Sequence, residues 1–182
     1  MGRTSYYTAT SLDGFIATAD HSLDWLLSRK AGSGGPLDYE TFIGGVGALC
    51  MGANTYAWMH RQLHDQADRP AEPWPYAQPC RVFTHHELPA WPEADIRFTA
   101  DPVEVVHAEL VALAGEKAVW VVGGGELAGQ FLDRGLLDEV VVNIAPVTLG
   151  SGQPLLPRRA DLRCVQTVPS GEFVAARFEV VR

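Results

Sequence analysis

The chain has 182 residues, of which 47% are hydrophobic and 20% charged, as expected for one compact domain with a sizeable core. A formal net charge of -8 argues against nucleic acid or an anionic membrane as the main partner, because both attract clustered Lys and Arg. Cys50, Cys80 and Cys164 are far apart, so they suggest neither a disulfide framework nor a zinc ribbon and are predicted core residues. We expect a single domain over residues 1–182. We also expect a cytoplasmic location, since the N-terminal stretch shows no secretory or myristoylation signal.

The first half of the chain alternates strand-like and helix-like segments. Residues 3–10 are predicted to form a strand and residues 15–17 a brief extended segment, and a loop with flexible glycines follows. A helix is predicted to begin near Pro36, with Asp38 and Glu40 in its first turn. The next segments are a buried strand over 48–52, a helix over 53–63 capped by Asn54 or Thr55, and a proline-rich surface loop over 64–79.

The second half continues this alternation and then changes character. The predicted segments are a strand and turn over 81–89, a strand over 95–100, a helix over 101–113 capped by Asp101 with Pro102 at its first position, and a strand over 118–122. After a further helix ending near Gly135, the runs 138–146, 162–169 and 172–181 are strand-like with no helix between them, so they should be antiparallel. The order predicts an α/β fold with a mixed, mainly parallel sheet and helices on both faces.

Three consecutive glycines, residues 123–125, separate the strand over 118–122 from a helix with Glu126 in its first turn. Such a turn can allow tight packing of strand against helix, or it can present free N–H groups to a phosphate at the helix N-terminus. Gly123, Gly125 and Ala128 also satisfy the dinucleotide fingerprint G-x-G-x-x-[GA]. However, a Rossmann unit needs an acidic residue about 20 residues on, where this chain has only Val, Asn and Ile.

Four separated stretches together resemble the dihydrofolate reductase-like superfamily, in particular bacterial proteins similar to the reductase domain of riboflavin biosynthesis. They are "ATSLDGFIA" near the N-terminus, "MGANTY", "VFTHHEL" and the long stretch that begins "VVGGGELAGQFL". The resemblance spans nearly the whole chain. It implies a three-layer sandwich around a mixed sheet, with NADPH as the hydride donor and NADH as the alternative.

The resemblance also implies positions for the parts of the cofactor. The backbone of Ala9 and Ile16 would hold the nicotinamide, and Thr84, His85 and His86 would surround the adenosine 2′-phosphate. The pyrophosphate would lie at two helix starts, formed by Gly52, Ala53, Asn54 and Thr55 and by Val122, Gly123, Gly124, Gly125, Glu126 and Leu127. Two positions depart from the family. Ala53 replaces an arginine that pairs with the 2′-phosphate, and Glu126 places a carboxylate next to a diphosphate unless it points away.

A reductase of this kind needs one acid near the acceptor. Asp38 is the best match to the acidic residue that pairs with the pterin ring in dihydrofolate reductases, with Glu40 as an alternative, and Asp13 lies on a loop that resembles the substrate-side loop. Each has a structural alternative, since Asp38 favours a helix start and Asp13-Gly14 favours a turn. Aromatic residues such as Trp25, Phe42 and Trp58 could form a wall over a flat substrate or belong to the core.

His60 and His64 have the i, i+4 spacing of a zinc-binding helix, but the Glu of H-E-x-x-H is absent and the sequence places no third ligand. We therefore expect a solvated helix end and no metal.

These observations leave two classes of function. The first is an NADPH-dependent reductase of a small, polar heterocyclic or ribityl-type substrate, resembling the reductases of the riboflavin pathway, such as the 5-amino-6-(5-phosphoribosylamino)uracil reductase, or dihydrofolate reductase. The second is a non-catalytic nucleotide-binding scaffold that kept the fold, for which Ala53 and Glu126 argue. Relatives commonly form homodimers, so the expected partners are a small molecule and a second copy of the chain.

Overall fold

The computed structural model describes residues 2–65, 68 and 70–182. The predicted surface loop over 64–79 therefore includes three residues, 66, 67 and 69, that lie outside the described residues. Within the described part, no helix is long and apolar enough to cross a membrane.

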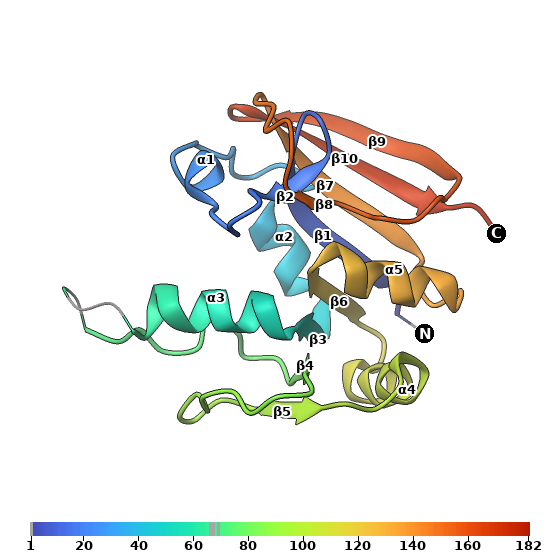
Figure 1. The fold of residues 1–182 in the computed structure, drawn as a ribbon. Coiled ribbons are helices and arrows are strands. Elements are labelled where there is room, and N and C mark those ends of the chain that lie inside the picture. Colours follow the sequence, from blue (N-terminus) through green and yellow to red (C-terminus); the bar gives the residue numbers. More distant parts are fainter. Residues whose placement is uncertain (1, 66–67, 69) are drawn as a thin grey trace.

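The centre of the molecule is an eight-stranded mixed sheet with the order β5-β4-β3-β6-β1-β7-β10-β9 (Figure 1). Neighbouring strands from β5 to β7 are parallel, whereas β10 is antiparallel to both β7 and β9. A small second sheet pairs β2 with β8. The strands are Thr4–Ser11 (β1), Phe15–Ala17 (β2), Val46–Gly52 (β3), Cys80–Phe83 (β4), Ile96–Thr99 (β5), Ala118–Gly123 (β6), Glu139–Ala145 (β7), Gln153–Pro154 (β8), Leu162–Ser170 (β9) and Phe173–Val180 (β10).

Helices cover both faces of this sheet. Successive side chains of a strand point to opposite faces, so Tyr6 and Tyr7 of β1 belong to two different core clusters. The Tyr6 cluster includes residues of α4 and α5, and the Tyr7 cluster includes residues of α3. The helices are Asp24–Leu27 (α1), Tyr39–Gly44 (α2), Ala53–Leu63 (α3), Val103–Ala114 (α4) and Gly125–Asp133 (α5). The predicted α/β architecture is confirmed.

The sheet changes direction between β3 and β6. The connection from β3 through α3 leads to β4 on one side, whereas the connection from β6 through α5 leads past β1 to β7 on the other side. The two helices pack on opposite faces, so a crevice is left outside the carboxyl ends of β3 and β6. Ligands of open α/β sheets bind at such switch points.

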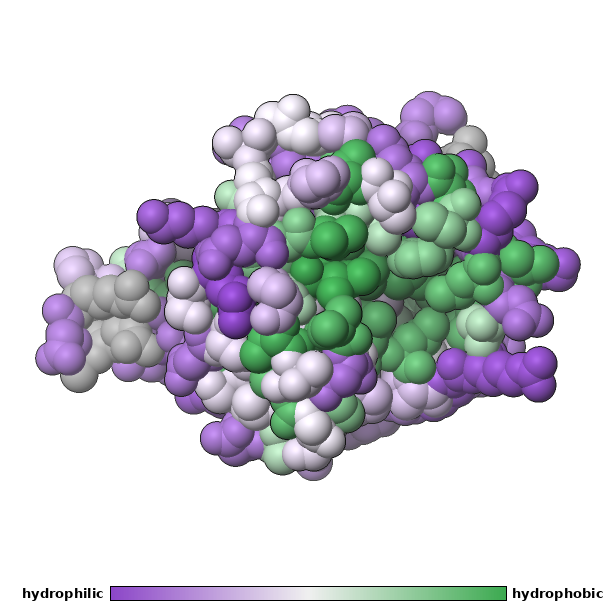
Figure 2. Space-filling view, turned by 90° about the horizontal axis from the view of Figure 1, so that it is seen from above, coloured by the Kyte–Doolittle hydropathy of each residue, from purple (hydrophilic) through white to green (hydrophobic). Residues whose placement is uncertain are grey.

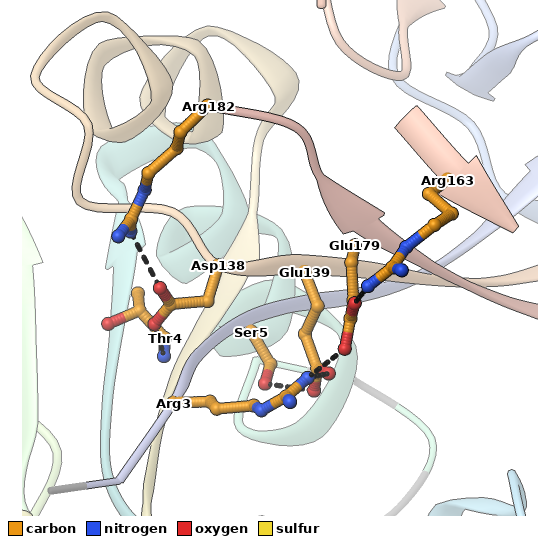
Figure 3. A network of polar contacts seen from close by, with 8 residues as sticks. All are labelled: Arg3, Thr4, Ser5, Asp138, Glu139, Arg163, Glu179 and Arg182. Carbon is orange, nitrogen blue, oxygen red and sulfur yellow. Dashed lines mark hydrogen bonds and ion pairs between the residues drawn. The ribbon is translucent and has the colours of Figure 1, made fainter. Parts of the chain in front are cut away.

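The amino ends of the parallel strands, opposite this crevice, hold a network of charged residues that is shown in Figure 3 and that we call the charged edge. Ser5 donates a hydrogen bond to the buried carboxylate of Glu139 at 2.7 Å, and Arg3 bridges Glu139 and Glu179 at 3.1 and 2.9 Å. Arg163 also binds Glu179, and beside this network Asp138 accepts from the Thr4 N–H and binds Arg182.

Several local predictions were wrong. Asp38 is the N-cap of α2 rather than a first-turn residue, because its carboxylate accepts a hydrogen bond from the Thr41 N–H. The N-caps of α3 and α4 are Gly52 and Pro102, not Asn54, Thr55 or Asp101. The short helix α1 lies in the predicted glycine-containing loop.

Two predictions about burial also require correction. Cys164 is exposed on β9, an edge strand, while Cys50 and Cys80 are buried as predicted. His60 is only 5% exposed, so it is not part of a solvated helix end. It packs against Trp91, a residue distant in the sequence, and periodicity within one helix does not reveal that contact.

Candidate functional site

A cleft of about 950 Å³ lies at the carboxyl edge of the sheet, over the switch point between β3 and β6. It is lined by residues from the ends of β3, β4, β5 and β6 and from the first turns of α3, α4 and α5. Most of the predicted cofactor residues meet there, namely Ile16, Gly52, Ala53, Asn54, Thr55, Thr84, His85, Val122, Gly123, Gly124, Gly125, Glu126 and Leu127. Ala9 and His86 are not among its lining residues.

Two helices begin side by side in the cleft, and both are capped by glycine. Gly52 is the N-cap of α3 and Gly124 that of α5, and neither residue has a side chain to accept from the N–H groups of the first turn. The strands that precede the two helices are neighbours, with Met51 of β3 opposite Gly123 of β6. The positive ends of both helix dipoles therefore face the same part of the cleft, which suits an anion.

Gly124 and Gly125 of this glycine run have different surroundings. A Cβ on Gly125 would lie 2.2 Å from the carbonyl oxygen of Pro154, so this glycine allows close packing against the segment that includes β8. A Cβ on Gly124 would meet only the side chain of Ile16, at 3.8 Å, and Gly124 itself lines the cleft. Close packing therefore explains Gly125, whereas Gly124 keeps space open in the cleft.

The charge of Glu126 is balanced by an arginine that the sequence did not suggest. Arg158 contacts both carboxylate oxygens of Glu126, at 2.6 and 3.1 Å, and also binds Asp133 at 2.9 Å. The guanidinium of Arg158 lowers the pKa of Glu126. This fork-like pair removes much of the repulsion that an isolated carboxylate at this helix start would exert on a phosphate.

The β4–β5 end of the cleft contains charges of both signs. Thr84 and His85 follow β4, and Asp101 and Glu104 surround the start of α4. Arg134 is the one arginine among the described lining residues, and its guanidinium binds Glu104 at 2.7 Å. The Thr84 hydroxyl is occupied by a turn contact with the backbone of His86, and His86 lines a separate shallow hollow.

The opposite end of the cleft, which we call the acceptor end, lies beyond Gly124 toward β1 and β2. It is lined by Thr8, Ile16, His21, Leu23, Trp58 and Tyr76. Of the three aromatic residues considered for a wall, only Trp58 lines the cleft. Phe42 stacks on Tyr7 in the core, with ring centroids 4.2 Å apart, and Trp25 is not among the described lining residues.

Asp13 and Asp38 are held by backbone groups near the cleft and are not among its described lining residues. Asp13 accepts hydrogen bonds from the Ser11 hydroxyl at 2.6 Å and from the N–H groups of Leu149 and Gly150 at 3.0 and 2.7 Å. Asp38 accepts from the N–H groups of Gly34 and Thr41. The hydrogen bond from Ser11 lowers the pKa of Asp13, and the hydrogen bonds from Thr41 lower the pKa of Asp38, so each carboxylate is held by the loop that it binds.

A second cluster of ligand-type atoms lies at the end of α3. The ligand atoms of His60, His64 and Asp65 all lie within 4.8 Å of one another, so the structure supplies the third group that the sequence did not place. The three residues already contact one another, because Asp65 lies 2.8 Å from His60 Nδ1 and 3.3 Å from His64 Nδ1. The expectation of no metal stays a prediction.

Comparison with known proteins identifies the family of this fold and cleft. The model of the RibD C-terminal domain family matches residues 5–174. The chain belongs to this family. The uncharacterized protein YwjB of Bacillus subtilis is 30% identical over 179 residues, which are 97% of each chain.

Solved structures of other RibD-type proteins and of a dihydrofolate reductase share this fold. A protein from Shewanella sp. PV-4, whose description links it to riboflavin biosynthesis, superposes with a TM-score of 0.78 at 25% identity over 99% of both chains. The deaminase/5-amino-6-(5-phosphoribosylamino)uracil reductase of Thermotoga maritima gives 0.67 at 17% identity, over 99% of this chain and 57% of that chain. The NADP(H) complex of Enterococcus faecalis dihydrofolate reductase gives 0.60 at 14% identity, over 99% and 97%. The dihydrofolate reductase-like fold is thereby confirmed.

Some lining residues of this RibD C-terminal domain were not predicted from its sequence. Tyr76, Gln153 and Pro154 reach the cleft from loops or from the two-residue strand β8. Such positions have no periodicity to reveal them. Strand β8 contains Pro154, and proline within a sheet is confined to edge strands, strand starts and bulges.

Proposed function

We propose that this protein is an NADPH-dependent reductase of a small heterocyclic compound. The observation that carries the proposal is the convergence of two glycine-capped helix N-termini at the switch point of the sheet. Such a pair of dipoles, with open space at Gly124, fits the pyrophosphate of a dinucleotide. The family supports a reductase, and the Enterococcus faecalis relative in fold is described in complex with NADP(H).

The residues of the cleft fit a dinucleotide that runs along the sheet edge. The N–H groups of α3 and α5 and the Thr55 hydroxyl would hold the phosphates, and Thr84 and His85 would border the adenosine. Ile16 and, through its backbone, Ala9 would hold the nicotinamide, which supplies the hydride when bound. The order follows the strands, because β4 and β5 lie on one side of the two helix starts and β1 lies on the other.

The cleft offers few positively charged side chains that could bind the 2′-phosphate, which distinguishes NADPH from NADH. Ala53 lines the cleft without a charge, and Arg134 is paired with Glu104. A 2′-phosphate would have to attract Arg134 away from Glu104 or bind a protonated His85. The NADPH preference is therefore proposed to be modest, with NADH as a weaker alternative.

The proton for the acceptor is proposed to come from the side that holds Asp13 and Asp38, with Glu40 as the alternative to Asp38. Both Asp carboxylates accept hydrogen bonds from backbone N–H groups and lie outside the described lining of the cleft, which is also what a scaffold without catalysis would show. This observation favours the second candidate function, a nucleotide-binding protein that no longer transfers hydride. The two functions differ in one measurement, the oxidation of NADPH by an acceptor.

A second copy of the chain is proposed to pack on the C-terminal strands. Figure 2, which looks onto the molecule from above Figure 1, shows hydrophobic residues in the centre and right of that face among hydrophilic ones. Val174 and Leu162 are 50% and 39% exposed. Leu162 pairs with Val180, which lies six residues after Val174 on β10, so the three side chains point to the same face of the β9–β10 pair. Exposed apolar residues on an edge pair favour self-association.

The first experiment is a fluorescence titration of the purified protein with NADPH and with NADH. Gly124→Leu should fill the space at the helix starts and abolish NADPH binding. The matched control is Gly44→Leu, because a Cβ at Gly44 meets nothing within 4 Å and Gly44 lies outside the described lining of the cleft. Equal NADPH affinity of the wild type and Gly124→Leu would refute the proposal, and so would the absence of saturable NADPH binding to the wild type.

A further inference from the structure

The acceptor end of the cleft is lined mainly by aromatic and aliphatic side chains. Trp58 lies on the same side of α3 as Thr55, one turn farther from the helix start, and Tyr76 is half-buried beside the core residue Trp120 at a ring-centroid distance of 5.4 Å. Ile16 and Leu23 add hydrocarbon surface. Two aromatic rings and aliphatic side chains form a surface that suits a flat ring.

Among the described residues of the acceptor end, His21 is the only one with a basic side chain. The other acidic and basic lining residues lie at the two helix starts or at the β4–β5 end, namely His85, Asp101, Glu104, Glu126 and Arg134. A phosphate group in a protein site is normally bound by Arg, Lys or a helix N-terminus. The described acceptor end provides neither Arg nor Lys.

Helix N-termini do not supply the missing charge. In the proposed function, the starts of α3 and α5 are occupied by the pyrophosphate of the dinucleotide. Two short helices also begin near this end. The four-residue α1 carries Asp24 in its first turn, and the six-residue α2 begins with Asp38 as its N-cap and Glu40 in its first turn, so carboxylates at both starts repel a phosphate. A phosphorylated acceptor would lose its hydration without gaining a charged partner, which costs binding free energy.

We infer that the acceptor is an uncharged, flat heterocycle that carries no phosphate group. This inference rests on the proposed function and narrows its substrate class. It separates this protein from the Thermotoga maritima relative, whose described substrate is a phosphoribosylamino-uracil. The acceptor would stack against Trp58 and Tyr76, while Thr8 and His21 would provide hydrogen bonds to its polar edge.

The test compares matched compounds with and without a phosphate group on the NADPH-saturated protein. The first pair is 5-amino-6-(5-phosphoribosylamino)uracil and its dephosphorylated riboside, and the second pair is riboflavin and its 5′-phosphate. We expect at least one uncharged member to bind, and to bind about 10- to 100-fold more tightly than its phosphorylated partner. The inference is overturned if the phosphorylated member binds equally or more tightly in either pair, or if no uncharged member binds.

A charge-insertion variant tests the same point from the side of the protein. Leu23→Arg places a cation in the acceptor end and should improve binding of the phosphorylated members about tenfold, while the uncharged members keep their affinity. Leu27→Arg is the control, since Leu27 lies in α1 but is 62% exposed and is not a described lining residue. Equal effects of the two variants would contradict the inference.

The titration with NADPH alone distinguishes a failure of the proposed function from a failure of the inference about the acceptor. If the protein does not bind NADPH, the proposed function fails before any acceptor is tested. If NADPH binds and Gly124→Leu prevents it, but phosphorylated compounds are preferred, only the inference about the acceptor fails.

Discussion

Strand β1 connects two ends of the sheet that use charge in opposite ways. At its start, the charged edge joins Arg3, Glu139 and Glu179 directly to one another, side chain to side chain (Figure 3). At its other end, Asp13 and Asp38 bind backbone N–H groups, and the helix starts at Gly52 and Gly124 are left without a capping side chain. At one end the charged side chains satisfy each other, and at the other the N–H groups of two helix starts stay available to a ligand.

The charged edge should contribute mainly to the stability of the fold, and the cleft mainly to ligand binding. Glu139 is 8% exposed, and its carboxylate is contacted by both Ser5 and Arg3, so a change there leaves buried groups without partners. The cleft instead depends on space and on backbone dipoles. Variants at the two ends should therefore separate the free energy of unfolding from the affinity for NADPH.

The largest effect is expected for Gly125→Val, which should damage both properties. A Cβ at residue 125 would lie 2.2 and 2.5 Å from the carbonyl oxygens of Pro154 and Leu155, so the segment that includes β8 must move. We expect the free energy of unfolding to fall by more than about 2 kcal/mol and NADPH binding to be lost. Urea unfolding and titration measure the two effects. Gly124→Ala, whose Cβ has only a 3.8 Å contact, is the control and should fold normally.

Glu139→Ala should affect stability alone. Removal of the carboxylate leaves the Ser5 hydroxyl and the Arg3 guanidinium without this partner, at a cost of about 1–3 kcal/mol in urea unfolding. Arg163→Ala is the matched control, because the Arg163 side chain is 72% exposed and its ion pair with Glu179 should contribute almost nothing. A change in the dissociation constant of NADPH in Glu139→Ala would break the proposed separation of the two ends.

Arg158→Gln should affect binding more than stability. Without Arg158 the Glu126 carboxylate would face the diphosphate uncompensated, and we expect about 3- to 10-fold weaker NADPH binding at low salt, with the loss reduced at high salt. The double variant Glu126→Gln/Arg158→Gln should bind like the wild type, because both charges are removed together. Failure of the double variant to restore affinity would mean that Arg158 acts through packing on Gly129 instead.

The smallest effect concerns acid sensitivity. Hydrogen bonds lower the pKa of folded Asp13 below its ordinary value of 3.8, so its contribution to stability is fully present above that value and is lost as the pH falls through the folded pKa. Asp13→Asn should therefore destabilise the protein at pH 7 and make its stability fall less steeply below about pH 4. Unfolding curves from pH 7 to pH 3 measure this slope, and a slope equal to that of the wild type would refute the assignment.

Much of the fold could be predicted because it depends on local patterns. The buried strand before the three glycines, the helix after them and the antiparallel C-terminal strands follow from periodicity and from residues that favour turns. The convergence of Gly52 and Gly124 followed from the family resemblance, and the parallel pairing of β3 and β6 explains it physically.

The remainder depended on contacts between distant parts of the chain. Arg158 lies 32 residues from Glu126, and nothing near either residue indicates their pairing. Asp13 was expected to meet a substrate, yet its N–H partners at Leu149 and Gly150 are 136 and 137 residues away. Local sequence gives a carboxylate at a turn, and only the tertiary structure shows which groups approach it.

The hydrogen bonds from Leu149 and Gly150 to Asp13 join the N-terminal part of the chain to a segment that is synthesised late. Because synthesis proceeds from the N-terminus, both glycine-capped helices leave the ribosome before the segment that holds Pro154 and Leu155. Residues 149–155 bind Asp13 through the N–H groups of Leu149 and Gly150 and pack on Gly125 through Pro154 and Leu155, and Gln153 and Pro154 line the cleft. A nascent chain ending before this segment would carry both helix starts but only part of the pocket, so capture of the dinucleotide should be a late event that follows the assembly of the last strands.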